Sequence, residues 1–410
     1  MKPHTLFLPT LGLGLLSFSG ARAQEALVGA LQTDRVLQAR AQPQAGKMIG
    51  PLSWSAAGTF RAEYNDNFRQ RSTDQLSDFI FRPGFDLGLI WPISQRASLA
   101  FGVGVQYAAY LEYDENNSLE ISPDTAISLS FTAGDVVITV FNQLSYTEEV
   151  LSDPEITDRA QYPRLENQAG VRATWTIGDW QAQGGWTHAN FWPLDDDFSY
   201  LERTSEQFFL RGAHLIGPGT RAGIEASASF TDYREDVRRD FNSYSAGPFV
   251  EWTILQGLAV SARGGAVRNE LSGNSVAPDD TTLDSYYFGG SVDHQLTDFI
   301  RHSISAQHGL RVGLNAEFTE ATTLRYDIRW QMTDVWDVSA GVLYELGERP
   351  DGSGGLDEEY DRFGLQAGIG RPLWGRLSVR ADYRYTRRES NLENRDYDQN
   401  IVSVSLRYRF

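Results

Sequence analysis

The sequence lacks cysteine and lacks long apolar runs beyond its N-terminus. None of its 410 residues is cysteine, which excludes disulfides and fits an exported protein that avoids oxidation chemistry. After the first 23 residues there is no apolar run of about 18 residues, so we expect no helical membrane span. Charged residues make up 22% and hydrophobic residues 41%, a balance that does not indicate disorder.

Recognisable catalytic motifs are also missing. None of the later histidines lies in a G-x-S-x-G or other nucleophile context; these are His188, His214, His294, His302 and His308. No two loop carboxylates have a spacing that suits acid–base chemistry on a sugar. There is no phosphate-binding glycine loop and no patch suited to nucleic acid. We therefore predict no enzyme, no cofactor and no nucleic-acid partner.

Two histidines flank an expected turn at Thr297-Asp298. His294 and His302 could meet across this hairpin, and a metal pair is one interpretation because imidazole is a common zinc ligand. Two surface side chains beside a turn are the alternative, and we predict no metal site.

The N-terminus has the features of a secretory signal. Lys2 precedes an apolar run from Leu6 to Phe18, and Ala21-Arg22-Ala23 has the small-x-small cleavage pattern. We expect a signal peptide over residues 1–23 that is cleaved after Ala23. A single membrane anchor is the alternative, disfavoured because the run is short.

The C-terminal residues alternate strictly in polarity. One face carries Val402, Val404, Leu406, Tyr408 and Phe410, and the other carries Ser403, Ser405, Arg407 and Arg409. This period predicts a β-strand with one apolar side. The end resembles the last strand of outer-membrane barrels, so we interpret Tyr408 and Phe410 as a signal for the barrel assembly machinery. A soluble protein seldom ends on such a strand, because its edge would invite aggregation.

From Trp54 onward, strand-like segments are separated by connections that are alternately short and long. We expect strands over residues 53–65, 77–92, 96–112, 118–132, 135–147, 164–177, 179–191, 203–216, 219–232, 242–254, 257–270, 283–296, 299–312, 321–332, 335–346, 359–371, 374–387 and 396–410. These are about 18 strands of a length that suits tilted membrane crossing, with 16 as the alternative if a connection at 113–117 or 313–320 is misassigned.

Short turns on one side and long acidic loops on the other are typical of outer-membrane barrels, with the turns in the periplasm. Trp91, Trp180, Trp252 and Trp336 lie beside short turns, as in an interfacial aromatic girdle. Backbone groups in lipid must all be paired, so the sheet must close. We predict an all-β, closed antiparallel transmembrane barrel over residues 53–410, with a soluble β-sandwich as the alternative.

Residues 24–52 differ from the rest. Apolar residues stand loosely at helical spacing before Pro43 and Gly46 break the pattern. We expect a short periplasmic helix or a flexible leader, and a small plug inside the barrel is the alternative.

The parity of each strand predicts which side chains face the lumen, which should be aqueous in a barrel this wide. The expected lumen-lining arginines are Arg61, Arg82, Arg172, Arg221, Arg263, Arg325, Arg329, Arg376, Arg380, Arg384, Arg407 and Arg409. The expected inward acids are Glu63, Asp86, Glu225, Glu251, Asp327 and Asp382. Cations outnumber acids there although the whole chain has a net charge of −18, because the surplus acid lies mostly in the loops.

Two interpretations of these arginines stay open. A cationic wall would attract anions and slow cations. Alternatively, arginines and acids pair across strands and brace a wide barrel.

The opening strand Phe60-Arg61-Ala62-Glu63-Tyr64-Asn65-Asp66-Asn67-Phe68, the repeated hairpins and the Leu406-Arg407-Tyr408-Arg409-Phe410 end resemble the beta-barrel porin-2 family. The resemblance covers residues 53–410. It implies an outer-membrane barrel, often associated with exopolysaccharide production or export, and it implies no catalytic residues.

We therefore expect a porin-like channel in the outer membrane of a Gram-negative cell, for anionic solutes or an acidic polysaccharide. Its expected partners are membrane lipid, lipopolysaccharide and the barrel assembly machinery. The alternatives are a structural or assembly barrel that serves a secretion or exopolysaccharide machine and, less favoured, an outer-membrane hydrolase.

Overall fold

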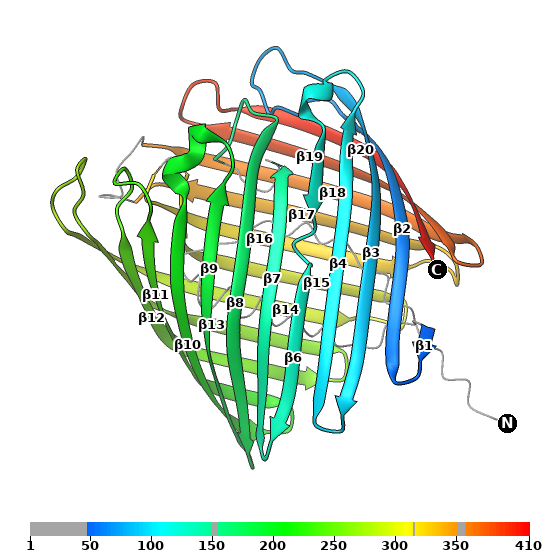
Figure 1. Ribbon diagram of the computed structural model, residues 1–410, viewed down its shortest axis with the longest axis vertical. Coiled ribbons are helices and arrows are strands. Elements are labelled where there is room, and N and C mark those ends of the chain that lie inside the picture. The colour runs from blue at the N-terminus through cyan, green and yellow to red at the C-terminus, as the bar shows by residue number, and fades with distance from the viewer. Residues whose placement is uncertain (1–46, 150–154, 315, 351–356) are drawn as a thin grey trace.

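The computed structural model describes residues 47–149, 155–314, 316–350 and 357–410. They form one antiparallel sheet whose last strand pairs with its first long strand (Figure 1). The expected signal peptide and residues 24–46 of the expected leader lie outside the described residues. Within the described ranges, no helix is both long and apolar enough to cross a membrane.

The described residues up to Gly217 form ten strands and two short 3-10 helices. The strands are β1 (Lys47–Ile49), β2 (Leu52–Asn65), β3 (Asp78–Ser94), β4 (Ala97–Tyr110), β5 (Ser118–Ile121), β6 (Ala126–Ala133), β7 (Val136–Glu149), β8 (Gln161–Ile177), β9 (Trp180–Pro193) and β10 (Arg203–Gly217). The helices η1 (Asp114–Asn116) and η2 (Asp196–Leu201) precede β5 and β10.

The second half continues the same up-and-down pattern. Its strands are β11 (Thr220–Tyr233), β12 (Phe241–Leu255), β13 (Leu258–Leu271), β14 (Thr281–Gln295), β15 (Ile300–Val312), β16 (Phe318–Gln331), β17 (Asp337–Glu348), β18 (Glu359–Trp374), β19 (Leu377–Ser390) and β20 (Tyr397–Arg409). β20 pairs with β2 from Asn65 to Ala57 and closes the barrel.

The wall has 18 positions. The sheet contains 20 strands, of which β5 and β6 share one position between β4 and β7, and β1 is a short extra strand on β2. The prediction of a closed 18-stranded antiparallel barrel is confirmed. The alternative of 16 strands is wrong, because the connections at 111–117 and 313–317 each join two separate wall strands. Residues 47–49, placed in the expected leader, form β1.

One expected strand is interrupted. The pattern at 118–132 predicts a continuous strand, whereas the structure breaks it at residues 122–125 into β5 and β6. Pro123 has no N–H to give to the ladder. The Ser122 amide still bonds to the Gly104 carbonyl of β4 at 2.9 Å, whereas the Thr125 amide turns back to the Ser122 carbonyl at 2.9 Å. A side chain at Gly104 would meet Ser122 at 2.9 Å, so glycine there makes room for the bulge.

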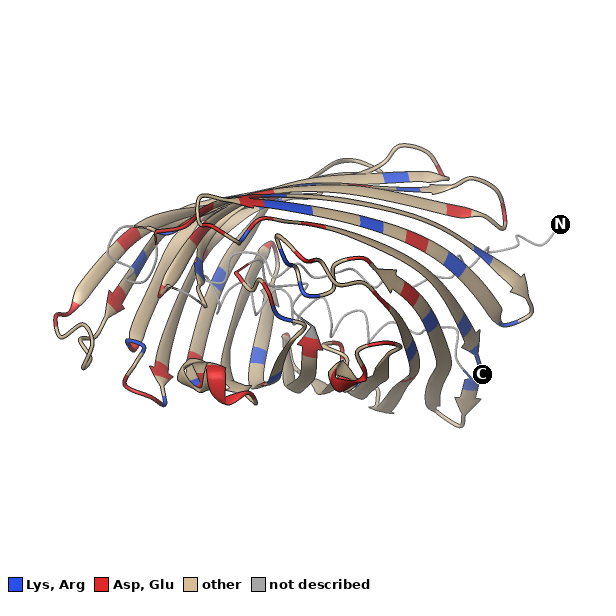
Figure 2. Ribbon diagram, turned by 90° about the horizontal axis from the view of Figure 1, so that it is seen from above, with Lys and Arg blue, Asp and Glu red and all other residues tan. Residues whose placement is uncertain are grey.

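The strands cross the barrel at a tilt. In Figure 1, β2–β10 run nearly upright, and the strands from β12 to β19 cross behind them. Such crossing follows from the twist of the sheet and the tilt that closure requires. Figure 2 shows the same two walls from above, facing each other across the barrel.

The two ends of the barrel differ. At one end, called the short-turn end, strands are joined by tight turns in which Gly134 and Gly178 adopt φ of 62° and 56°, a region that favours glycine. At the other, the long-loop end, the connections carry η1 and η2. Trp91, Trp180 and Trp252 are exposed at the short-turn end. Trp336 instead lies in a turn, half-buried, with the Arg371 guanidinium 4.9 Å from its ring centroid.

The outward face of the wall is apolar. On β2 and β20, exposed Phe60, Val402 and Val404 alternate with Glu63 and Ser403, which are buried on the opposite side. Large exposed apolar side chains continue around the barrel on every wall strand from β7 to β12. A soluble protein does not expose so large an apolar surface. A closed sheet with paired wall strands and an apolar exterior suits contact with the hydrocarbon of a membrane.

Candidate functional site

The candidate site is the inner face of the barrel, defined as the side opposite the exposed apolar residues. The register places on this face Arg61, Arg82, Arg172, Arg221, Arg263, Arg325, Arg329, Arg380, Arg384, Arg407 and Arg409. The acids on the same face are Glu63, Asp86, Glu225, Glu251, Asp327 and Asp382. Arg376 is a correction: it is exposed in the turn before β19 begins at Leu377, so it is not part of the wall.

Further arginines share the inner face and were not predicted there. They are Arg164, Arg203, Arg211, Arg301, Arg311, Arg362 and Arg388. Strand parity in the sequence could have identified these arginines as inward residues. Arg388 has the parity of Arg380 and Arg384 on β19, and Arg301 lies directly opposite Arg329.

The end of the β15–β16 hairpin leaves the wall and folds inward. β14 and β15 stop pairing at Phe288–His308, whereas β15 and β16 stay paired up to Val312–Phe318. Leu310 and Phe318 have the parity of outward residues, yet they are 1% and 0% exposed and pack in one cluster with Phe241. Since Phe241 faces inward, residues 309–314 and 316–320, together called the inward tip, lie inside the barrel.

A segment from across the barrel holds the inward tip. Glu155, in the loop after β7, accepts hydrogen bonds from the Leu314 amide at 2.6 Å and the Thr319 hydroxyl at 2.6 Å. The Arg311 guanidinium lies 3.7 Å from the same carboxylate, and Ile156 packs in a cluster with Leu314. β7 and β15 are far apart around the ring, so these contacts cross and narrow the mouth at the long-loop end.

Two further loops contact the tip. The Tyr200 hydroxyl of η2 donates to the Leu314 carbonyl at 3.5 Å. Burial raises the pKa of Tyr200 in spite of the nearby Arg238 and Arg159, so this hydroxyl keeps its proton and remains a donor. Arg238, in the loop after β11, donates to the Gly313 carbonyl.

A buried charge network supports the base of the tip. Glu345 is 1% exposed and bonds to Arg311 at 3.3 Å and to Arg362 at 3.0 Å. The Tyr360 hydroxyl donates to the same carboxylate at 2.9 Å. Arg311 and Arg362 thus share one carboxylate in a place that water hardly reaches, so loss of that carboxylate would leave buried positive charge without its partner.

Nearer the short-turn end, β15, β16, β19 and β20 carry a set of inward arginines that we call the arginine wall. Its members are Arg301, Arg325, Arg329, Arg380, Arg384, Arg407 and Arg409. Arg380 bonds to Asp337 and Asp382, both at 2.7 Å, and Arg407 bonds to Asp86 at 3.0 Å. Among the described residues, no carboxylate lies within ion-pair distance of Arg329 or Arg409. Cations therefore exceed acids on this wall.

The opposite part of the inner face, on β7–β14, is built differently and is called the ring wall. Phe141 lies across from Gly170 and Phe209 from Gly185. A Cβ at either glycine would come within 2.8 Å or 2.6 Å of its partner ring, so the rings lie flat on the glycine backbone, a known device in sheets.

Arginines of the ring wall stack on these rings. Arg172 lies 5.9 Å and 5.4 Å from the ring centroids of Phe141 and Phe209. Arg211 lies 3.6 Å above Phe249 and bonds to Glu251 at 2.7 Å. Cation–π contact of this kind holds a guanidinium against the wall.

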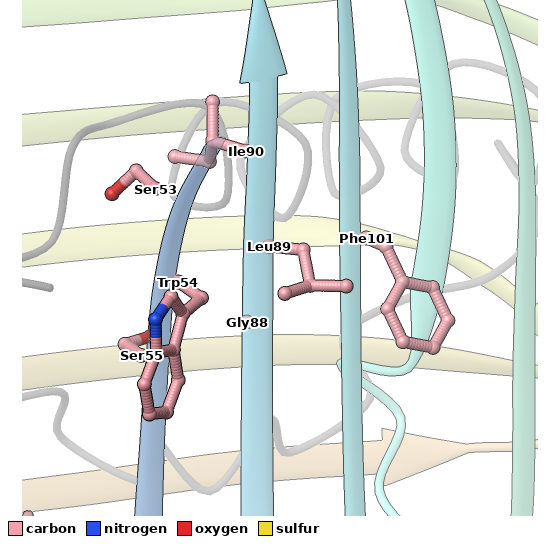
Figure 3. A pocket seen from close by; sticks show the side chains of 7 residues that line it. All are labelled: Ser53, Trp54, Ser55, Gly88, Leu89, Ile90 and Phe101. Carbon is pink, nitrogen blue, oxygen red and sulfur yellow. The ribbon is translucent and has the colours of Figure 1, made fainter. Parts of the chain in front are cut away.

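A shallow hollow elsewhere in the wall carries no charge. Figure 3 shows its lining near the short-turn end of β2–β4, which includes Trp54, Leu89, Ile90 and Phe101. We assign it no ligand, because its only polar side chains are two serines and an indole. In the part of the chain that the structure describes, no three His, Asp or Glu side chains gather as a metal site.

The fold defines the class: a closed antiparallel β-barrel of the outer-membrane type, with 18 wall positions. No protein-family model matches the sequence, and no curated protein shows significant similarity to it.

Several solved structures are similar to this chain, and one of them reaches a TM-score that indicates a shared fold. The crystal structure of Pseudomonas aeruginosa OccK2 (OpdF) in complex with glucuronate has a TM-score of 0.50 at 15% identity, covering 87% of this chain and 98% of that one. Acinetobacter baumannii OccAB3 has a TM-score of 0.48 at 12% identity, covering 87% and 99%. P. aeruginosa OpdK with vanillate has a TM-score of 0.47 at 11% identity, covering 87% and 99%.

Proposed function

We propose that the protein is an outer-membrane channel that passes small anionic solutes along its arginine wall. The carrying observation is the excess of inward arginines over acids on β15, β16, β19 and β20. A low-dielectric wall that carries one sign of charge concentrates ions of the other sign beside it. The apolar outward face supports placement of the barrel in the outer membrane, with its short turns in the periplasm.

The arginines have two roles in this proposal. Those buried with Glu345 and those stacked on rings brace the barrel. Arg329 and Arg409, which have no carboxylate within ion-pair distance among the described residues, keep positive charge for a passing anion. The two interpretations that the sequence leaves open thus apply to different arginines.

The narrowed mouth supports a small solute over a bulky one. The inward tip and the Glu155 segment meet from opposite sides of the barrel. A solute that enters must pass this junction before it reaches the arginine wall. OccK2, which shares the fold, has been crystallised with glucuronate. A sugar acid is therefore a reasonable first solute to test, since a carboxylate pairs well with a guanidinium.

The test is reversal potential in planar bilayers under a salt gradient. We expect the wild-type channel to prefer anions and Arg329→Glu to reduce that preference. Arg371→Glu is the matched control. It makes the same change of charge, but Arg371 lies on β18 and faces outward over Trp336. Equal reversal potentials in wild type and Arg329→Glu would refute a role for the arginine wall in selectivity.

A second candidate rests on the same junction. A mouth crossed by two segments also suits a closed barrel that serves a secretion or exopolysaccharide machine. This role would follow from membership in the beta-barrel porin-2 family, which we keep as a proposal on the strength of residues 60–68 and 406–410. Purified protein without any conductance would favour it over the channel. Neither candidate needs a catalytic residue.

Processing and assembly remain part of the proposal. Cleavage after Ala23 would give a mature chain that starts at Gln24. Tyr408 and Phe410, both exposed on the outward face, would be recognised by the barrel assembly machinery. Lipid and lipopolysaccharide would surround the oily exterior.

A further inference from the structure

Two histidines meet on the outer face of the barrel, away from the inner face. His294 on β14 and His302 on β15 are direct cross-strand partners near the short-turn end. The His294 Nδ1 and His302 Nε2 atoms are 3.1 Å apart, and the ring centroids are 5.1 Å apart. Both residues have the parity of Val292 and Ile304, and Ile304 is exposed, so the pair faces outward.

The separation of these nitrogen atoms suits a shared cation. Zinc–imidazole bonds are about 2.0–2.1 Å long. Two such bonds that meet at an angle of roughly 90–110° place their nitrogens roughly 2.9–3.4 Å apart. The observed 3.1 Å lies inside that interval, so the strands already hold the two imidazoles at a chelating distance.

The tautomers of the two imidazoles also allow a cation to bind between them. When both rings are neutral, one ring can donate its N–H to the other across the 3.1 Å between the facing nitrogens. If that proton moves to the far nitrogen of the same ring, both facing nitrogens carry lone pairs. The neutral pair can then bind a cation without losing a proton, which is the form of imidazole that binds metal.

Against the expectation of no metal site, we propose that His294 and His302 form a binding site for a first-row divalent cation of the Cu²⁺ or Zn²⁺ type. The pair lies beside the turn at Thr297-Asp298, at the end of the barrel, where water can complete the site. Imidazole suits both metals, and Cu²⁺ binds nitrogen sites more tightly than its neighbours in the series. Water must complete the site, because the described residues place no third His, Asp or Glu beside the pair.

The position of the site gives it a structural consequence. β14 and β15 pair only from the short-turn end to Phe288–His308 and separate beyond that point. A cation on His294 and His302 would clamp the paired end of the same two strands. The site is independent of the proposed channel, since it lies on the outer face.

The experiment is a Cu²⁺ titration of the full-length folded protein in detergent, followed by electron paramagnetic resonance. We expect saturable binding of one Cu²⁺ per chain with nitrogen splitting from two imidazoles. His294→Gln and His302→Gln should each weaken binding by about tenfold or more and leave splitting from at most one imidazole at this site. His214→Gln is the matched control, because His214 also lies near the short-turn end but stacks on Trp180, 4.4 Å away.

Two results would overturn the site. One is a double variant, His294→Gln with His302→Gln, that binds Cu²⁺ as tightly as wild type. The other is wild-type affinity no higher than that of the single variants. Heat-modifiable migration in electrophoresis checks that each variant is folded. If a variant is not folded, Zn²⁺-dependent protection of the wild-type histidines from diethyl pyrocarbonate, compared with His214, decides the question, and equal reactivity overturns the proposal.

Discussion

The ring wall and the arginine wall both carry inward arginines, but the partners of these arginines differ between the two walls. On the ring wall, Arg172 and Arg211 lie against aromatic rings. On the arginine wall, Arg380 is shared by two aspartates, while Arg329 has no carboxylate within ion-pair distance among the described residues. The comparison teaches that the number of arginines does not measure the charge available to a solute; their partners do.

The two walls also depend on different neighbours. The rings of the ring wall need glycine beside them, because any side chain at Gly185 would strike Phe209. The arginine network above the other wall needs its acids, because Glu345 is the carboxylate that the buried Arg311 and Arg362 share. Replacing a glycine therefore disturbs the packing of the rings, and replacing an acid disturbs the charge balance of the buried arginines.

The largest effect should come from Glu345→Ala. This change leaves Arg311 and Arg362 buried without their shared carboxylate, which should cost about 3–5 kcal/mol in free energy of unfolding. Glu348→Ala is the control on the same strand, because Glu348 is exposed and should change stability by about 0.5 kcal/mol or less. Guanidinium unfolding followed by tryptophan fluorescence measures both, and similar losses would contradict the buried network.

Arg380→Ala and Arg329→Ala should have opposite consequences. Loss of Arg380 removes charged hydrogen bonds to two aspartates and should lower the free energy of unfolding by about 1.5–3 kcal/mol. Loss of Arg329 should leave stability nearly unchanged and reduce the anion-to-cation permeability ratio by about twofold. Unfolding curves and reversal potentials on both variants separate the two roles, and a larger stability loss in Arg329→Ala would reverse our assignment.

Gly185→Ala should disturb the ring wall. The new Cβ would lie 2.6 Å from the Phe209 ring and 2.8 Å from the Val171 carbonyl, and such overpacking costs about 1–3 kcal/mol. Gly212→Ala is the control on the adjacent strand, since a Cβ there meets nothing within 4 Å. If both variants unfold at the same denaturant concentration, the flat packing of Phe209 is not a constraint.

Glu155→Gln should change stability less than Glu345→Ala, Arg380→Ala or Gly185→Ala. The amide can still accept from the Leu314 N–H but loses its charge beside Arg311, a loss of about 0.5–1.5 kcal/mol. The expected result is a looser inward tip, visible as greater current noise and a higher single-channel conductance. Unchanged conductance traces would mean that Glu155 does not set the width of the mouth.

The fold could be predicted because its signal is local. Alternation of polar and apolar residues repeats in each strand, and the strand ends coincide with glycine and acidic turns. The interruption at Pro123 was visible as a proline within an expected strand. Arg376 was misplaced because it follows Gly375, whose φ of 54° belongs to the turn.

The inward tip could not be predicted for a physical reason. Leu310 and Phe318 have the parity of lipid-facing residues, and an apolar side chain has the same signature whether it meets lipid or Phe241. Contacts between Glu155 and the tip join residues more than 150 positions apart, and no sequence period encodes them. Parity placed side chains on a face but gave no information on their partners.

The seam of the barrel has one more consequence. β20 runs along one edge of β2 until the Phe410 amide bonds to the Ala56 carbonyl at 3.0 Å. β1 follows it on the same edge and in the same direction, starting with Lys47 opposite Trp54. β20 and β1 therefore lie end to end along β2, like one strand with a break in the chain between them. A circular permutant would join Phe410 to Lys47 through about one or two residues, each spanning about 3.4 Å, and open new ends at Gly178-Asp179. It would cut only the β8–β9 turn, keep the pairing of every wall strand, and leave both termini at the short-turn end.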